Sequence, residues 1–227
     1  MSLFPADLRA RLAPAGADVP HPGPFPTAPL PETIDAAIAQ FTAACEAVGG
    51  KVSRVTGSAE AAAIVRHYLD APDWRSTPEA PARFVSWDAA HLPLPGVLDA
   101  LDGHAERLDT HVRRDAADRA DDYRRLDDAI VGVTGTHAAL ADTGSVVLVH
   151  GAGRPRLASL LPPVHVALVP VSTLRATLGA LVAEEPDLLH GAANVVVVTG
   201  PSRTADIEMT LTRGVHGPRV VHVVFIG

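Results

Sequence analysis

Short runs of Val, Leu and Ile alternate with loops of Gly, Pro, Ser and Thr in the C-terminal part of the chain. Such apolar runs are typical of strands buried on both faces of a mostly parallel sheet, which needs helices on both sides. The sequence therefore predicts an α/β fold with three layers, and ligands at the carboxyl ends of the strands. The runs are Ile130 to Val133, Ser145 to Val149, Val164 to Val169, Val195 to Val198 and Val220 to Ile226.

The spacing of apolar residues predicts the remaining elements. Steps of three and four predict a helix from Glu32 that ends at Gly49 and Gly50, and Cys45 lies on its apolar face as a core residue. Other segments with a regular pattern are a strand from Lys51 to Val55, a helix to Leu69 capped by Ser58, a strand from Arg83 to Trp87, one or two amphipathic helices between Leu98 and Ile130, and a crossover helix from Ser172 to Ala183 capped by Ser172 or Thr173.

Eight prolines lie between Pro5 and Pro31, where they remove backbone donors that helices and sheets need. We expect an extended N-terminal arm over residues 1–31, which either lies on the surface or binds a partner as a Pro-rich ligand does. A single α/β domain over residues 32–227 is expected to follow it.

The composition excludes several classes of function. A net charge of -7 with a single Lys gives no basic face for nucleic acid. One cysteine cannot by itself hold an iron-sulfur cluster or a structural zinc ion, and no metal site is expected. No apolar run reaches the length of a membrane span, so we expect a cytoplasmic protein.

The first candidate site is the turn Asp142, Thr143 and Gly144 before a buried strand. The Asp142 carboxylate could act as a base, as a nucleophile or as an anchor for a ligand hydroxyl. Alternatively, Asp142 and Thr143 hold the turn through their side chains, and Gly144 supplies a left-handed conformation. A short helix is expected between the preceding strand and this turn.

The second candidate combines Arg156 and Ser159, which precede Pro162 and Pro163. A guanidinium group can clamp a carboxylate or phosphate with two hydrogen bonds, although a surface ion pair is an equally available role. His165, which begins the next strand, is expected to be a hydrogen-bonded core residue.

The third candidate follows the strand that ends at Val198. Gly200 and Ser202 are expected to open a helix whose free N–H groups and dipole attract an anion. The alternative is that Ser202 merely caps this helix and that the loop only shapes the chain around His216. The further candidate ligand contacts are Thr204, Asp206, Glu208 and His216.

Familiar nucleotide-binding motifs are absent. The single Lys51 is not part of a P-loop, and His150-Gly-Ala-Gly-Arg154 lacks the third glycine of a dinucleotide-binding fingerprint.

The three candidate motifs together resemble the LUD domain of the lactate-utilisation protein C family in order and spacing. The resemblance is carried by residues 135–148, by Arg156 with residues 159–165, and by residues 200–208 with 214–218, within residues 130–226. It implies a Rossmann-like fold similar to glucosamine-phosphate deaminase, ribose-phosphate isomerase and CoA transferases. In that wider group a glutamate can be nucleophile or base, and Asp142 occupies the corresponding position with a shorter side chain.

The resemblance implies a component of L-lactate utilisation, in which L-lactate is oxidised to pyruvate together with iron-sulfur partner proteins. Because this chain cannot hold a cluster alone, we expect an accessory or substrate-handling subunit that binds a small anionic metabolite. No cofactor follows from the sequence. The alternatives are a free-standing enzyme acting on a CoA ester, sugar phosphate or folate-like substrate, and an interaction protein that uses the arm and residues 98–130.

Overall fold

The computed structural model describes residues 29–74, 80–113, 115–188, 192–205, 211–213 and 217–227. The predicted arm, residues 1–31, lies almost entirely outside this part of the chain. Among the described helices, none combines the length and the apolar character that a membrane span requires.

A six-stranded sheet forms the centre of the molecule, and all of its neighbouring strands are parallel. Every strand predicted for this sheet in the first half of the chain is present, which confirms the α/β class. In order across the sheet the strands are β1 (Lys51–Val55), β12 (Val220–Ile226), β7 (Val164–Pro170), β4 (Val131–Thr134), β2 (Arg83–Ser86) and β3 (Glu106–Arg107).

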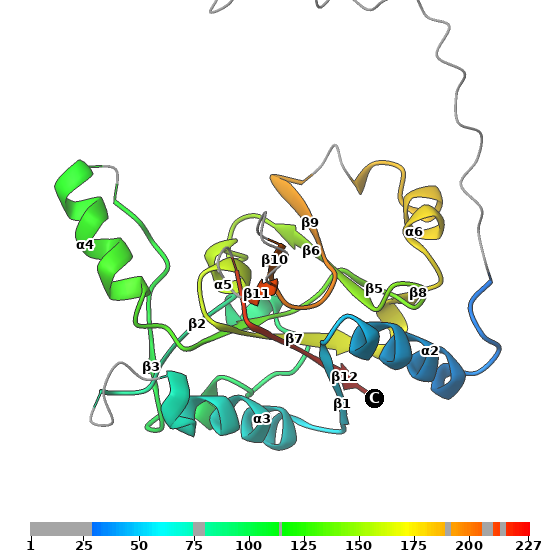
Figure 1. Cartoon of the computed structure of the whole chain (residues 1–227), viewed down its shortest axis with the longest axis horizontal. Helices are drawn as coiled ribbons and strands as arrows, with labels where there is room; N and C mark the ends of the chain where they lie inside the picture. The colour runs from blue at the N-terminus through cyan, green and yellow to red at the C-terminus, as the bar shows by residue number, and fades with distance from the viewer. Residues whose placement is uncertain (1–28, 75–79, 114, 189–191, 206–210, 214–216) are drawn as a thin grey trace, which may run out of the picture.

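Helices cover both faces of this sheet, which gives the three predicted layers (Figure 1). Helix α3 (Ser58–Asp70) lies on one face, and α5 (Leu157–Leu160) packs on the other against β4. Helix α2 (Ile34–Ala47) buries Phe41 edge-on against Phe225, with ring centroids 5.0 Å apart. The predicted cap of α3 is wrong by one position, because Gly57 is the N-cap and no side chain caps this helix.

A second sheet of four strands lies on the α5 side, where the sequence predicted additional strands of the parallel sheet (Figure 1). Its strands, in order, are β8 (Leu174–Arg175), β5 (Ala138–Leu140), β6 (Ser145–His150) and β9 (Asn194–Val198). Strand β6 pairs antiparallel with both β5 and β9. The segment before Asp142, where a short helix was expected, forms strand β5. Only four residues connect β5 to β6, which is too short for a parallel crossover, so the two strands pair antiparallel.

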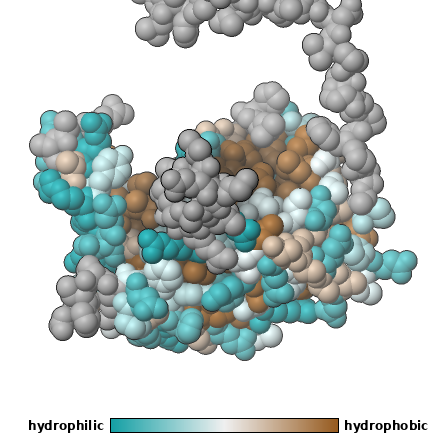
Figure 2. Space-filling model, in the orientation of Figure 1, coloured by the Kyte–Doolittle hydropathy of each residue, from teal (hydrophilic) through white to brown (hydrophobic). Residues whose placement is uncertain are grey.

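Strand β9 is an edge strand, so the prediction that it is buried on both faces is wrong. Val197 on β9 is 41% exposed, and Leu178 and Val182 on α6 are 44% and 36% exposed. Figure 2 shows a hydrophobic area over β9 and β6 beside α6.

The predicted amphipathic helices between Leu98 and Ile130 are only partly confirmed. Helix α4 (Ala116–Leu126) is present and projects from the body of the molecule (Figure 1), and Tyr123 on it is exposed. Before α4 the chain forms the short helix η3 (Asp99–Leu101), strand β3 and extended backbone. Leu101 and Leu108 are buried there without a continuous helix, because Gly103 turns the chain with φ +75°.

The crossover helix α6 (Leu178–Glu184) begins later than predicted. Thr177, not Ser172 or Thr173, is its N-cap, and its hydroxyl accepts the N–H of Ala180 at 3.0 Å. The remaining short elements are η1 (Pro72–Trp74), η2 (Ala89–His91), η4 (Val171–Thr173) and a hairpin of β10 (Arg203–Ala205) and β11 (Leu211–Arg213).

Candidate functional site

The carboxyl ends of β2 and β4 meet at one edge of the parallel sheet. The N–H of Trp87, just after β2, donates to the carbonyl of Val133 on β4 at 3.0 Å. Thr136 follows β4, and its hydroxyl donates to the carbonyl of Leu168 on β7 at 3.1 Å. Ligands of open parallel sheets bind at this edge, so it is the place to look for a site.

A glycine turn brings Arg154 to the same edge. Strand β6 ends at His150, and Gly151 and Arg154 exchange backbone hydrogen bonds across the turn. The carbonyl of Gly153 accepts the N–H of Asp88 at 2.8 Å. Gly153 has φ +69°, and a Cβ there would lie 2.6 Å from the ring of His91, so only glycine allows this approach.

These segments enclose a hollow of about 110 Å³, which we call the carboxyl-end hollow. Its lining is largely polar: Trp87, His91, Thr136, His137, Val149 and Arg154. His137 Nε2 lies 2.7 Å from a carboxylate oxygen of Glu185, which follows α6.

Several buried polar atoms beside the hollow have no hydrogen-bond partner in the described part of the chain. They are Trp87 Nε1, Arg154 Nε and both ring nitrogens of His150. The rings of Trp87 and His150 meet edge-on with centroids 5.9 Å apart. Buried polar groups are nearly always satisfied by protein or water, so this group of unpaired atoms is unusual and marks the region beside the hollow as a candidate site.

Burial lowers the pKa of His150. The neighbouring Arg154 backbone acts in the opposite direction, and the charges of Arg156 and Arg154 lower the pKa further, each to a smaller extent. The guanidinium groups of Arg154 and Arg156 therefore both lie close enough to His150 to affect its pKa.

Arg154 and Arg156 form no ion pair with any described residue, in contrast to several other arginines. Arg54, Arg83, Arg107, Arg113, Arg124 and Arg175 all contact carboxylates. Two guanidinium groups without carboxylates, next to unpartnered N–H groups, can hold a carboxylate or another small anion through charge-assisted hydrogen bonds.

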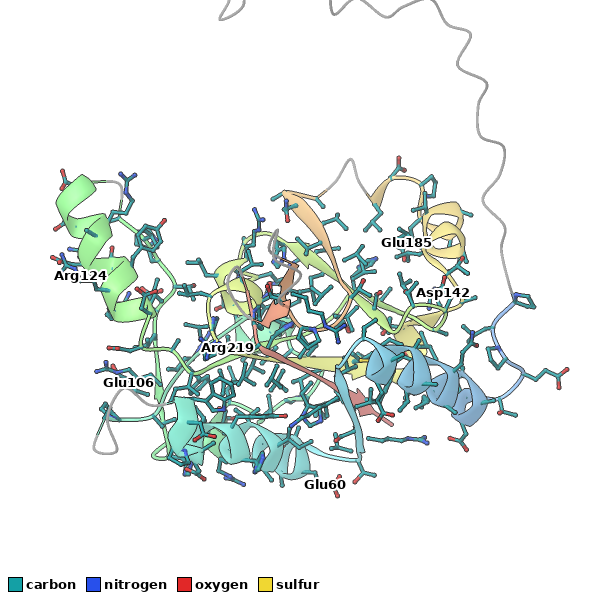
Figure 3. All side chains as sticks on the ribbon, viewed as in Figure 1. Glu60, Glu106, Arg124, Asp142, Glu185 and Arg219 are labelled. Carbon is teal, nitrogen blue, oxygen red and sulfur yellow. The ribbon has the colours of Figure 1, made fainter. Side chains whose placement is uncertain are left out.

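Asp142 lies at the opposite end of β6, beside α6 (Figure 3). From Ser145 to His150 this strand spans about 17 Å, so the structure does not bring Asp142 and Arg156 together. Asp142 is exposed; its N–H donates to Ala176, and its Oδ1 accepts the hydroxyl of Thr143 at 3.2 Å. The role of Asp142 in catalysis stays a prediction.

Gly144 takes the left-handed conformation of the alternative interpretation, with φ +62°. The hydroxyl of Ser145 donates to Thr143 Oγ1 and lies 2.8 Å from Thr199 Oγ1, which ties this turn to the third motif. The first and third motifs therefore meet near the end of α2.

Arg156 is exposed at the start of α5, as a ligand contact requires, whereas Ser159 is buried. The Ser159 hydroxyl donates to the carbonyl of Arg156 at 3.1 Å. His165 is fully buried and its Nε2 lies 2.9 Å from Thr134 Oγ1, which confirms the prediction of a core histidine.

The prediction of a helix after Ser202 is wrong, because β10 and β11 form an antiparallel hairpin there. The Ser202 N–H donates to the carbonyl of Pro218 at 2.8 Å, so it is not a free anion-binding group. Gly200 has φ +72° and packs against Val48. Asp206, Glu208 and His216, and the side chain of Thr204, lie outside the described residues.

Sequence reasoning located the loops of the carboxyl-end hollow but missed the residues that line it. Trp87 and His91 belonged to no motif, His137 lay within the first motif without being named as a site residue, and Arg154 was considered only within an incomplete dinucleotide fingerprint. The available signal was their position directly after buried strands. In the described part of the chain, no group of three or more His, Cys, Asp or Glu side chains could hold a metal ion.

Comparison with known proteins identifies relatives over most of the chain. The family model of the LUD domain matches residues 38–226. Lactate utilization protein C of Anoxybacillus flavithermus is 38% identical over 120 residues, which cover 52% of this chain and 53% of that protein. Lactate utilization protein C of a Geobacillus species is 35% identical over 141 residues, 59% of this chain and 58% of that protein. The chain thus spans about half the length of these curated relatives.

A solved structure shares the fold. The crystal structure of a DUF162 family protein from Deinococcus radiodurans superposes with a TM-score of 0.59 at 22% identity, covering 87% of this chain and 100% of that chain.

Proposed function

Since the chain belongs to the LUD domain family, we propose that it takes part in L-lactate utilisation by binding a small organic acid at the carboxyl-end hollow. The observation that carries this proposal is the pair Arg154 and Arg156, which have no carboxylate partner among the described residues and lie beside unpartnered buried N–H groups. The relatives named lactate utilization protein C support the choice of lactate.

Each group of the hollow has a distinct role in this proposal. The guanidinium of Arg154 binds the carboxylate, and the positive charge of Arg156 adds to the attraction of the anion. In this proposal the indole N–H of Trp87 and the imidazole of His150, whose rings are in contact, hydrogen-bond the 2-hydroxyl or 2-keto oxygen. A neutral imidazole can also accept a proton, as a general base for a hydroxy acid must.

Oxidation of L-lactate to pyruvate releases two electrons and two protons. The single Cys45 cannot hold an iron-sulfur cluster alone, so the electrons must pass to a partner. We propose that this chain is the substrate-handling subunit and that iron-sulfur proteins are its partners.

Growth tests this proposal. A strain that lacks the gene should grow poorly on L-lactate and normally on glucose, and the wild-type gene should restore growth. Arg154→Gln should fail to restore it, while Arg119→Gln, on the exposed face of α4, should succeed. Unimpaired growth of the deletion strain on L-lactate would remove the role in lactate utilisation.

A further inference from the structure

The outer face of the four-stranded sheet is only partly covered by α6. Leu181 of this helix packs there on a small apolar cluster of β5 and β6, which is separate from the main core. Val195 of β9 packs against the same cluster, and Val197 of β9 lies opposite Val147, which belongs to it. Helix α6 has only seven residues, so it leaves the β9 side of this face open.

Exposed apolar side chains gather on this face. Three of the five large apolar side chains that are exposed in the described part of the chain lie here: Leu178 and Val182 on α6, and Val197 on β9. Leu178 and Val182 are one helical turn apart, so they form a stripe beside the buried Leu181. Single exposed apolar residues are ordinary, whereas a group of them marks an interaction surface. We call these three residues the α6–β9 surface.

The N-terminal arm joins the body of the molecule beside the same helix. Pro29 and Leu30, the first residues that the structure describes, line a hollow of about 360 Å³ together with Ala180 and Glu184 of α6. Leu30 also packs against the main core, which fixes this end of the arm. The residues before Pro29 are therefore tethered next to the helix that carries the exposed stripe.

The sequence of the arm contains an apolar pattern that matches this surface. Seven of its prolines lie from Pro14 to Pro31, whereas residues 6–13 contain none. Phe4, Leu8 and Leu12 recur at steps of four, a spacing that places them on one face of a helix. Such a face can pack against the apolar stripe of another helix, as amphipathic helices do in apolar grooves.

The length of the arm allows this contact within one molecule. The Pro-rich segment between Leu12 and Pro29 can extend by about 3.1 Å per residue, roughly 50 Å in all. Helix α6 is only about 10 Å long, so the segment reaches past it. A tether raises the local concentration of the arm to the order of 1 mM. The arm of the same chain therefore has the advantage over a second copy at micromolar concentration.

We propose that residues 4–12 bind the α6–β9 surface of the same molecule, with Phe4, Leu8 and Leu12 covering its three apolar side chains. The arm then completes the outer layer over the four-stranded sheet. This inference is independent of the proposed function, because it uses none of the residues that line the carboxyl-end hollow.

Trypsin digestion tests whether the arm is bound. The bonds after Arg9 and Arg11 lie in the proposed contact, and no other Lys or Arg precedes Lys51, so mass spectrometry identifies these cleavages without ambiguity. A synthetic peptide of residues 1–28 gives the rate of cleavage without protection. In the native protein both bonds should be cleaved at least about tenfold more slowly, because a bound segment must first be released.

Matched variants locate the protection. Val182→Asp places a charge in the α6–β9 surface and should raise the cleavage rate to that of the peptide. Tyr123→Asp changes another exposed apolar side chain, on α4, and should leave the rate as in the wild type. Leu8→Ser, compared with a peptide that carries the same substitution, should also lose protection, and it leaves the body of the protein unaltered.

The outcomes decide the proposal. Protection in the wild type and in Tyr123→Asp that is lost in both Val182→Asp and Leu8→Ser supports it. Cleavage of the native protein at the rate of the peptide overturns it, and so does protection that either Val182→Asp or Leu8→Ser retains. Protection that disappears on roughly hundredfold dilution would show that the arm binds a second copy, which overturns binding within one molecule.

Discussion

A Cβ atom at Gly144 would lie 2.2 Å from the backbone nitrogen of Cys45. The turn after β5 therefore packs directly on the backbone of α2, and at φ +62° it also needs a left-handed residue. Gly144 thus has a structural task, whether or not a ligand binds near it.

Gly144→Ala should lower the free energy of unfolding by about 3 kcal/mol, from backbone strain together with the steric conflict. Gly103→Ala is the matched control, because Gly103 has φ +75° but a Cβ atom there would meet no described atom within 4 Å. Gly103→Ala should lower the free energy of unfolding by about 1 kcal/mol. Equal losses in urea denaturation would show that the contact with α2 is unimportant.

Stability should fall on acidification because of His165. Burial lowers the pKa of this histidine to about 4, and the neighbouring His150 adds to the effect. Between about pH 6.5 and pH 4 the unfolded chain binds a proton that the folded chain does not. The stabilisation is complete above pH 6.5 and is lost as the pH falls, by roughly 3 kcal/mol at most.

A double variant isolates this contribution. Thr134→Val with His165→Leu replaces the hydrogen-bonded pair by apolar groups of similar size, which keeps the core filled. Its unfolding free energy should decline less steeply than that of the wild type between pH 7 and pH 4.5. An unchanged slope would mean that other groups, such as His222, account for the acid sensitivity.

Thr177→Ala should destabilise the protein by about 1 kcal/mol, because it removes the hydrogen bond that caps α6. Ser172→Ala should have an effect below about 0.5 kcal/mol, since the exposed Ser172 lies before the helix begins. Thermal denaturation of both variants tests whether α6 begins after Thr177. A larger loss of stability in Ser172→Ala than in Thr177→Ala would instead support the helix start predicted from the sequence.

Cys45 should not react with thiol reagents while the protein is folded. Burial raises the pKa of its thiol to about 11, with a further contribution from Glu46, so almost no thiolate exists at neutral pH. Titration with a disulfide reagent should give no reaction until denaturant is added. Rapid labelling of the native protein would contradict the packing of α2.

Most strand positions were predicted correctly, because a continuous apolar run such as Val164 to Val169 indicates a buried strand without reference to distant residues. The sequence did not predict pairing: β6 and β9 are rich in Val as β7 is, yet they pair antiparallel in a separate sheet. Which strands pair depends on contacts between distant segments. The hairpin after Ser202 was missed as well. A serine that caps a helix and a serine in a turn cannot be told apart from one sequence.

The candidate site was predicted in its location but not in its residues. Ligands were expected at the carboxyl ends of the predicted strands, and two of these ends, after Val133 and Val149, supply Thr136, His137 and Arg154. Trp87 comes from a strand far away in the sequence and reaches them only through the parallel pairing of β2 with β4. None of the predicted ligand contacts that the structure describes lines this hollow, although the exposed Arg156 lies close enough to affect the pKa of His150.

The central claim is that a small organic acid binds at the carboxyl-end hollow, and titration calorimetry with L-lactate tests it most directly. The wild type should bind L-lactate, and Arg154→Gln should weaken binding at least tenfold by removing a charge-assisted contact. Asp142→Ala and Arg119→Gln should bind as the wild type does. No binding by the wild type, or loss of binding in Asp142→Ala but not in Arg154→Gln, would contradict the account and move the site to the other end of β6.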